Sequence, residues 1–361
     1  MFRGYCVLVM IEAHVSNATI LDSIQKTKTF HYLDLFNGTI APSFIFIAGF
    51  AVALALERKW DDFLKFSKPL WMHLRRLLFV LALGYWLHLP VWSLRTLIAR
   101  HDISVLNVDV LQLIAVSLFF TILIALIFRN LHRLKWPMLI LMLLIIFSTP
   151  FVFEADPKRI LPVAIAAYFD KASLFPIFPW AAYSFAGTFL SLIYLQIRGT
   201  EKERTFFRIL CIGGLLMTIS AFALFYVPWQ YHAYTDMARA SPRSFMMRIG
   251  AVLFVFSCFY FYEQWRKPAK SILNIAGQQS LMVYAVHLMI VYGTPLMNFN
   301  FANAIGRTLR YQQAFALSGG LIALMTIAAL LWHGLKSHQP REARAVLYAC
   351  SILFLLRFFL Y

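Results

Sequence analysis

Residues 107–128 read NVDVLQLIAVSLFFTILIALIF, a stretch in which Asp109 is the only charged side chain. A helix rises 1.5 Å per residue, so about 20 apolar residues suffice to cross the hydrocarbon core of a bilayer. The chain contains ten further stretches of this kind, three before this one and seven after it. The eleven predicted spans cover residues 4–21, 39–57, 73–93, 107–128, 134–153, 174–196, 205–226, 245–264, 271–293, 312–334 and 343–360.

The segments between these spans are too short to form a soluble domain, and no internal repeat is visible. We therefore expect an all-α polytopic membrane protein with about 10–11 transmembrane helices, forming one domain over residues 1–361. The first apolar run continues to about Leu21 without a small-residue cleavage site, so this helix is expected to remain in the mature protein.

The composition agrees with a lipid environment. Hydrophobic residues make up 61% of the chain and charged residues only 14%, whereas about a quarter of a soluble domain is charged. The net charge of +17 comes from basic loops and not from a separate basic domain, so we expect no nucleic-acid partner. Lys and Arg are more numerous in the loops on the side of the N-terminus, which predicts a cytoplasmic N-terminus.

The four cysteines predict neither disulfides nor a metal site. All of them lie inside apolar runs, and none has the close pair spacing of a zinc or redox motif. No other ligand spacing indicates a metal.

The first helix carries polar residues that a lipid-facing helix would avoid. Arg3 and His14 are eleven residues apart, so they share one helix face with a rise of about 16 Å. An imidazole with an ordinary pKa near 6.5 can accept a proton at neutral pH, and Asn17, one turn on, could orient its ring. An interhelical hydrogen bond is the other reading of His14. Glu12 lies on a different face, where a packing partner for another buried polar group is the better reading.

Two further pairs of polar residues each lie three positions apart. His31 and Asp34 are neighbours if their segment is helical, and they form either a general base with its orienting carboxylate or a solvated loop pair. Asp109 fits a helix start with Asn107 as the N-cap, and Gln112 is left without a role.

The ninth predicted helix has a stripe of hydrogen-bonding groups. Ser280, Tyr284 and His287 follow at spacings of four and three residues, so they share one face that is expected to point to the bundle interior or a water-filled cavity. Gly277 and Gln279 come near its cytoplasmic end, where they could line the entry of a polar ligand.

Four stretches together resemble a known family. FRGYCVLVMIEAH (2–14) resembles the Arg-Gly helix of transmembrane acyltransferases, in which a polar residue follows eleven positions after the arginine. APSFIFIAGFAVALALERK (41–59), VDVLQLIAVS (108–117) and FPIFPWAAYSFAGTFL (175–190) resemble helices of the bacterial-type relatives of heparan-α-glucosaminide N-acetyltransferase. Relatives commonly have an aspartate three residues before the arginine, a position that would precede Met1 here.

The resemblance implies a membrane acyltransferase that moves an acyl group, expected to be acetyl, from cytoplasmic acyl-CoA to an amino or hydroxyl group of a sugar or glycan at the outer side. It also implies a bacterial cytoplasmic membrane. The expected catalytic residues are His14, His31, Asp34 and Asn17, with His14 or His31 as the base and Asn17 or Tyr284 as a donor to the carbonyl. The expected residues for the CoA donor are Arg3, Arg75 and Arg76 before the third helix, and Gln279, Tyr284 and His287.

Several questions stay open at this stage. The sequence does not distinguish transfer through an acyl-histidine from direct transfer, nor does it give the acceptor, the acyl chain or the number of protomers, a homo-oligomer included. A transporter is the alternative function, because polar residues on several helices also describe a substrate path. The two similar halves of many transporters are not found, however. A third reading is a purely structural membrane protein, which would have to explain the buried polar groups of the first and ninth helices without chemistry.

Overall fold

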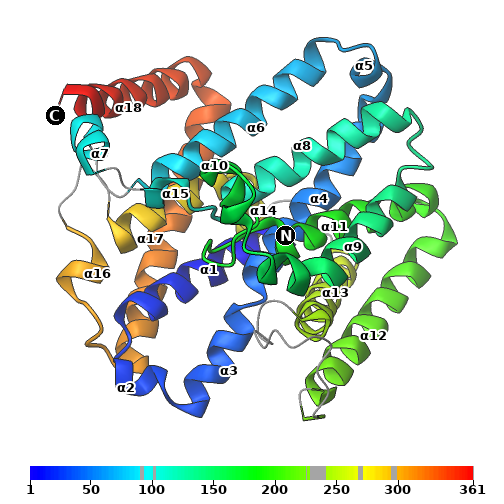
Figure 1. Ribbon diagram of the computed structural model, residues 1–361, viewed down its shortest axis with the longest axis horizontal. Coiled ribbons are helices and arrows are strands. Elements are labelled where there is room, and N and C mark those ends of the chain that lie inside the picture. The colour runs from blue at the N-terminus through cyan, green and yellow to red at the C-terminus, as the bar shows by residue number, and fades with distance from the viewer. Residues whose placement is uncertain are drawn as a thin grey trace. The chain divides into compact units, whose positions relative to one another are not determined.

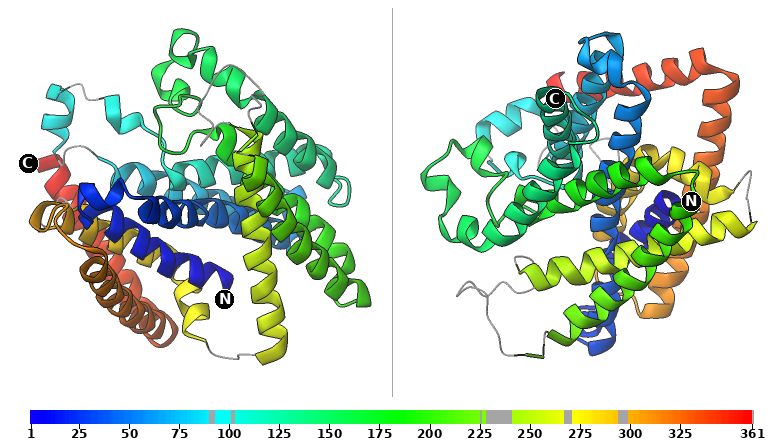
Figure 2. Two further views of the ribbon diagram at one scale, coloured as in Figure 1. Left: turned by 90° about the horizontal axis from the view of Figure 1, so that it is seen from below. Right: turned by 90° about the vertical axis from the view of Figure 1, so that its right-hand side faces the viewer.

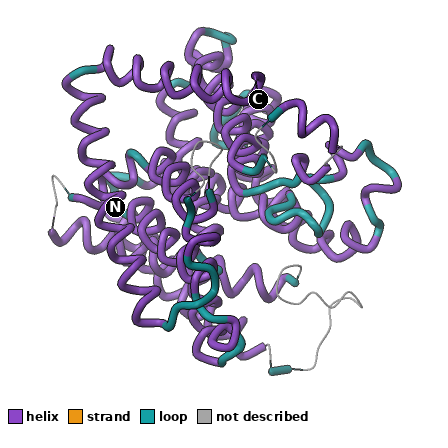
Figure 3. Tube along the Cα trace, turned by 90° about the vertical axis from the view of Figure 1, so that its left-hand side faces the viewer, coloured by secondary structure: helices purple, strands orange, loops and turns teal. Residues whose placement is uncertain are grey.

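The computed structural model describes residues 1–89, 93–100, 103–224, 226–227, 241–266, 271–293 and 299–360. The regular structure in these ranges is helical, as Figure 3 shows, and they contain no sheet. One isolated bridge joins Ile20 to Leu309. The all-α prediction is confirmed.

The chain forms two compact units. Unit 1 comprises Met1–Ile40, Leu89–Val105 and Glu263–Tyr361, and unit 2 comprises Ala41–His88 and Leu106–Tyr262. The expectation that residues 1–361 form a single acyltransferase domain stays a prediction.

The helices of unit 1 come from both ends of the chain (Figure 1). They are α1 (Phe2–Thr19), α2 (Asp22–Gln25), α3 (Lys28–Asn37), α7 (Leu94–Arg100), α14 (Ile272–Gln278), α15 (Ser280–Tyr292), α16 (Phe301–Ala304), α17 (Tyr311–His338) and α18 (Pro340–Leu360). Unit 2 holds α5 (Trp60–Leu64), α6 (Lys68–Leu87), α8 (Val110–Phe128), α9 (Lys135–Glu154), α10 (Val163–Ala166), α11 (Ile177–Ile197), α12 (Glu201–Leu224), the 3-10 turn Pro157–Arg159, and most of α4 (Ile40–Arg58) and α13 (Pro242–Arg266). The short turn Ile103–Leu106 lies where the two units meet in the sequence.

Nine helices of the described residues are long and apolar enough to cross a membrane, or ten if the bent pair α14 and α15 is one span. These ten correspond to ten of the eleven predicted stretches. The first stretch forms a helix, α1, but it is not among the candidate spans, because its polar residues lower its hydropathy. Residues 90–92 of the third predicted stretch and residue 225 of the seventh lie outside the described residues.

The ninth stretch differs from its prediction. Residues 271–293 were expected to form one helix, but α14 and α15 meet at Gln279 with a bend of 81°. The prediction of one helix was wrong. The length of an apolar segment indicates that it can cross a membrane, but it does not indicate where its backbone bends.

Glycines bring α14 against α1 in unit 1. A Cβ added to Gly4 would lie 1.9 Å from the Leu273 carbonyl oxygen, and one added to Gly277 would lie 3.0 Å from the Gly4 nitrogen. The two backbones therefore almost touch. Since α1 also packs on α15 and α17, it is surrounded by helices from the C-terminal part of the chain (Figures 1 and 2).

Glycines serve the same purpose in unit 2, where α11 packs on α4. A Cβ on Gly49 would lie 2.0 Å from the Ser184 carbonyl oxygen, and a Cβ on Gly187 would lie 2.0 Å from the Phe46 carbonyl oxygen. Only glycine allows this separation, so the APSFIFIAGF and FPWAAYSFAG stretches are matched to each other.

Candidate active site in unit 1

His14 lies at the centre of a cluster of ring side chains. Its ring centroid is 5.3 Å from that of His287 and 5.6 Å from that of Tyr292, and both neighbours belong to α15. The Nδ1 atom of His14 is 3.3 Å from the Tyr292 hydroxyl. Two helices that are distant in the sequence thus bring three polar rings together.

The hydrogen bonds of Tyr292 favour one tautomer of His14. The tyrosine hydroxyl donates to the backbone carbonyl of His14 at 3.4 Å, so it is available to accept from the Nδ1–H of the same residue. A neutral imidazole with its proton on Nδ1 carries its basic lone pair on Nε2. Tyr292 therefore orients His14 as a proton acceptor through Nε2.

His287 is fully buried and also has a defined tautomer. Its Nδ1 donates to the Val283 carbonyl at 2.7 Å, which leaves Nε2 as an acceptor. Within the part of the chain that the structure describes, this Nε2 is buried without a hydrogen-bond partner. Tyr284 contacts the same ring at 5.9 Å, and Ser280 is buried one turn earlier, so the predicted polar stripe does lie on a buried face of α15.

Arg3 and Gln279 lie toward the other end of α1. The Arg3 side chain is exposed, and its Cβ is 3.6 Å from the position that a Cβ of Gly277 would take. Gln279, only 6% exposed, contacts two residues of α17 through its amide: it meets His333 Nδ1 at 3.3 Å and accepts from Lys336 Nζ at 3.3 Å. Lys336 and His333 were not anticipated from the sequence.

The other predicted catalytic residues are not drawn into this cluster. His31 and Asp34 are exposed on α3, whose helical form agrees with the expectation. Among the described residues the His31 ring contacts Tyr32, and no hydrogen bond or ion pair joins it to Asp34. Asn17 is exposed, and its backbone carbonyl accepts from Gln25.

Glu12 has a partner that explains its place in α1. Its two carboxylate oxygens accept from the Ser16 hydroxyl at 2.6 Å and from the Asn37 amide at 2.9 Å. Since Asn37 ends α3, Glu12 ties α3 to α1. The reading of Glu12 as a packing partner for another polar group is confirmed.

Polar groups of unit 2

Arg75 and Arg76 lie inside α6 and not before it, because this helix already begins at Lys68. Both side chains are exposed. The prediction placed the start of this helix too late, because its first residues, from Lys68 on, include polar side chains and do not look like part of a span.

Asp109, and not Asn107, is the N-cap residue of α8, and its side chain forms no capping hydrogen bond. Its carboxylate instead pairs with His88 Nε2 at 2.7 Å, and His88 Nδ1 meets the Gly84 carbonyl at 3.1 Å. Each ring nitrogen of His88 therefore faces an acceptor, the Asp109 carboxylate at Nε2 and the Gly84 carbonyl at Nδ1. Gln112, fully buried beside Gly84, has no hydrogen-bond partner for its amide among the described residues.

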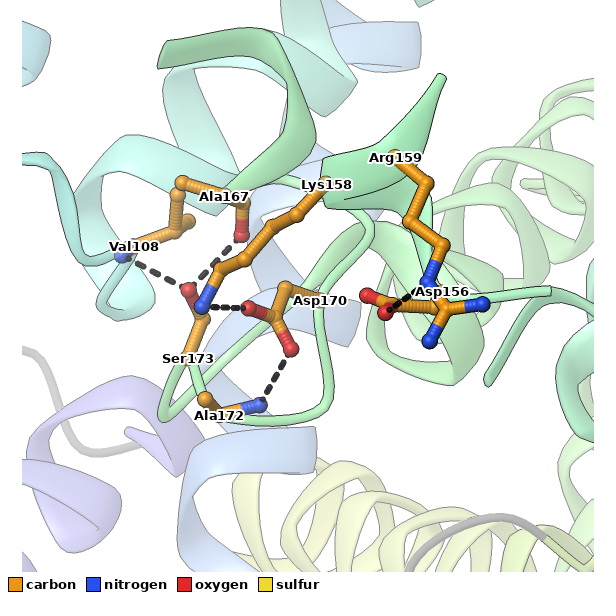
Figure 4. A network of polar contacts seen from close by, with 8 residues as sticks. All are labelled: Val108, Asp156, Lys158, Arg159, Ala167, Asp170, Ala172 and Ser173. Atoms are coloured by element: carbon orange, nitrogen blue, oxygen red, sulfur yellow. Dashed lines mark hydrogen bonds and ion pairs between the residues drawn. The ribbon is translucent and has the colours of Figure 1, made fainter. Parts of the chain in front are cut away.

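A polar network fixes the loop between α9 and α11 (Figure 4). Lys158 Nζ pairs with Asp170 at 2.5 Å, the Ala172 N–H donates to the same carboxylate, and Ser173 links Ala167 to Val108. Burial alone would raise the pKa of Asp170, but the Ala172 N–H and the Lys158 ammonium lower it below its ordinary value. Asp170 in turn raises the pKa of Lys158.

Comparison with known proteins

The family model described as heparan-alpha-glucosaminide N-acetyltransferase, catalytic, matches residues 1–230, which is more than half of the chain. The chain belongs to this family. No curated protein and no solved structure matches it.

Membership of the heparan-alpha-glucosaminide N-acetyltransferase family makes the chain a multi-pass membrane protein with the catalytic domain of an acetyltransferase, and this family uses acetyl-CoA as donor. His14 lies within the matched residues, whereas His287 and Tyr292 lie beyond them. The ring cluster therefore joins the helix that carries the Arg-Gly motif to a helix that the family model does not cover.

Proposed function

We propose that the protein transfers an acetyl group from acetyl-CoA to an amino or hydroxyl group of a sugar or glycan acceptor. The observation that carries this proposal is the geometry of His14: α1 holds its imidazole partly buried beside His287, with Tyr292 on Nδ1. Attack on a thioester by an amine or alcohol needs a base that is oriented by a second group.

In the proposed reaction the acceptor nitrogen or oxygen attacks the thioester carbonyl carbon while His14 Nε2 takes the acceptor's proton. The C–S bond then breaks, CoA leaves as the thiolate, and the imidazolium returns the proton to sulfur. The products are the acetylated acceptor and CoA–SH. His287 is proposed to support the charged form of His14, since its ring centroid lies 5.3 Å from that of His14 and its Nδ1 proton is held by the Val283 carbonyl.

The donor is proposed to lie along α1. Arg3 and His14 occur eleven residues apart on this continuous helix, a rise of about 16 Å, so an extended pantetheine arm can join a phosphate at Arg3 to a thioester at His14. Arg75 and Arg76 are kept as further candidates for donor phosphates, supported by their charge and exposure on α6. The loop charges support donor entry from the cytoplasm and an acceptor on the outer side.

A transporter is the second candidate, and one observation favours it. The break between α14 and α15 resembles the broken helices that line the substrate sites of secondary transporters. The two functions differ in a simple assay, because a carrier leaves the thioester intact.

The test is to incubate the purified protein with acetyl-CoA and glucosamine and to follow both CoA thiol release and acetylated sugar. We expect stoichiometric formation of the two products. If no sugar or hydroxyl acceptor causes thiol release by a folded protein that binds acetyl-CoA, the acetyltransferase proposal is wrong and the transporter becomes the better account.

A further inference from the structure

The break at Gln279 creates a helix N-terminus inside unit 1. The helix that starts there, α15, has 13 residues, and its first turn has no side-chain cap. The first N–H groups of a helix lack intrahelical acceptors, and together with the helix dipole they attract anions.

A second donor at this position lacks an acceptor. Ser280, the first residue of α15, is 2% exposed, and within the described ranges its hydroxyl has no hydrogen-bond partner. Helical side chains point back toward the N-terminus, so this hydroxyl lies beside the uncapped N–H groups. Leaving a buried hydroxyl unpaired is unfavourable, and an incoming acceptor would satisfy it.

Cationic side chains of two neighbouring helices flank the break. Lys336 of α17 donates to the neutral amide of Gln279, and in the part of the chain that the structure describes it has no carboxylate partner. Arg3 of α1 lies beside Gly277, two residues before the break. Both side chains are exposed, so both charges are accessible to a ligand.

We propose that this break is a phosphate-binding subsite, in which the N-terminus of α15, the Ser280 hydroxyl, Lys336 and Arg3 hold a phosphate of the donor's nucleotide. The inference rests on the proposed function, since it takes acetyl-CoA as the donor. Gln279 is the positioning residue, because its buried amide fixes Lys336 next to the helix start.

The test compares ligands that carry different parts of the donor's nucleotide. Calorimetric binding is measured for CoA, for 3′-dephospho-CoA and for acetyl-pantetheine, with the wild type, Lys336→Ala and Ser280→Ala. We expect Lys336→Ala to weaken CoA binding at least tenfold and Ser280→Ala several-fold, while binding of acetyl-pantetheine changes by less than twofold. Lys336→Arg is expected to retain most of the CoA affinity, and Lys202→Ala, an exposed lysine of α12, is expected to bind like the wild type.

Three results would overturn the inference. Equal losses for CoA and acetyl-pantetheine would mean that Lys336 acts through structure alone, and unchanged CoA binding in Lys336→Ala would place the phosphate elsewhere. If phosphatidylglycerol, and not CoA, raises the melting temperature of the wild type in a way that Lys336→Ala abolishes, the subsite holds a lipid phosphate. A wild type that neither binds nor cleaves any CoA species contradicts the proposed function itself, whereas tight CoA binding that ignores Lys336 contradicts this subsite alone.

Discussion

Among single residues, the proposed role of His14 as a base depends on its two hydrogen-bond contacts with Tyr292. Because the tyrosine hydroxyl donates to the His14 carbonyl and can accept from Nδ1–H, it favours the tautomer whose Nε2 is basic. Tyr292→Phe removes both bonds and keeps the ring. We expect kcat to fall about tenfold with little change in the KM for acetyl-CoA, which is less than the loss of the base itself would cause, because His14 stays in place. A KM that rises with kcat unchanged would instead place Tyr292 in donor binding.

The ion pair of Lys158 and Asp170 predicts a pH dependence. The pKa of Asp170 in the folded protein is lowered, so its stabilising contribution is fully present above the ordinary value near 3.9 and is lost as the pH falls through the folded value. We expect cleavage of residues 155–176 by pepsin to accelerate between pH 4 and pH 2.5 in the wild type.

The control is Asp170→Asn at each pH. In this variant cleavage is expected to be rapid already at pH 4. The ratio of the cleavage rate of Asp170→Asn to that of the wild type should therefore approach one as the pH falls. A ratio that does not change with pH would show that the ionised carboxylate does not hold the loop.

At the scale of helices, glycine contacts predict which substitutions the fold tolerates. The methyl group of an alanine at Gly49 or Gly187 would lie 2.0 Å from a backbone carbonyl oxygen of the other helix, so α4 and α11 would have to separate. Overpacking of this kind costs about 1–3 kcal/mol or more. We expect both variants to melt several degrees lower in detergent.

Gly213 of α12 is the matched control, because a Cβ there meets nothing within 4 Å. Alanine has the higher helix propensity by about 1 kcal/mol, so Gly213→Ala should melt at or slightly above the wild-type temperature. Equal destabilisation by all three substitutions would mean that the contact of α4 with α11 is not the cause.

Apolar length predicted the helices well and the site less well. The 22-residue stretch at 107–128 has one charged residue and is long enough to span a membrane, and the helix α8 forms there. The break at Gln279 could not be predicted, because it depends on α1 packing against Gly277 and on α17 residues that contact Gln279. Periodicity placed His14 and His287 on buried faces, whereas Tyr292 lies off the stripe of Ser280, Tyr284 and His287, so only the fold brings it to His14.

At the scale of the whole molecule, the charges of the loops predict sidedness. The helix α9 joins the loop that contains His132 to the loop that contains Ile160, and the first of these is predicted to be cytoplasmic. In a variant without its four native cysteines, His132→Cys should react with a membrane-impermeant maleimide only after cells are permeabilised. Ile160→Cys, whose native side chain is 73% exposed, should react in intact cells. The reverse pattern would place the N-terminus and the donor entry on the outer side.

The rate of acetyl transfer in a His14 variant decides whether His14 is the base of the proposed acetyl-CoA-dependent acetyltransferase. With an acceptor that the wild type acetylates, we predict that His14→Gln lowers kcat at least about 100-fold while acetyl-CoA still binds. His132→Ala, which changes an exposed histidine in a loop, should leave the rate unchanged. A His14→Gln variant that retains the wild-type rate would contradict the account.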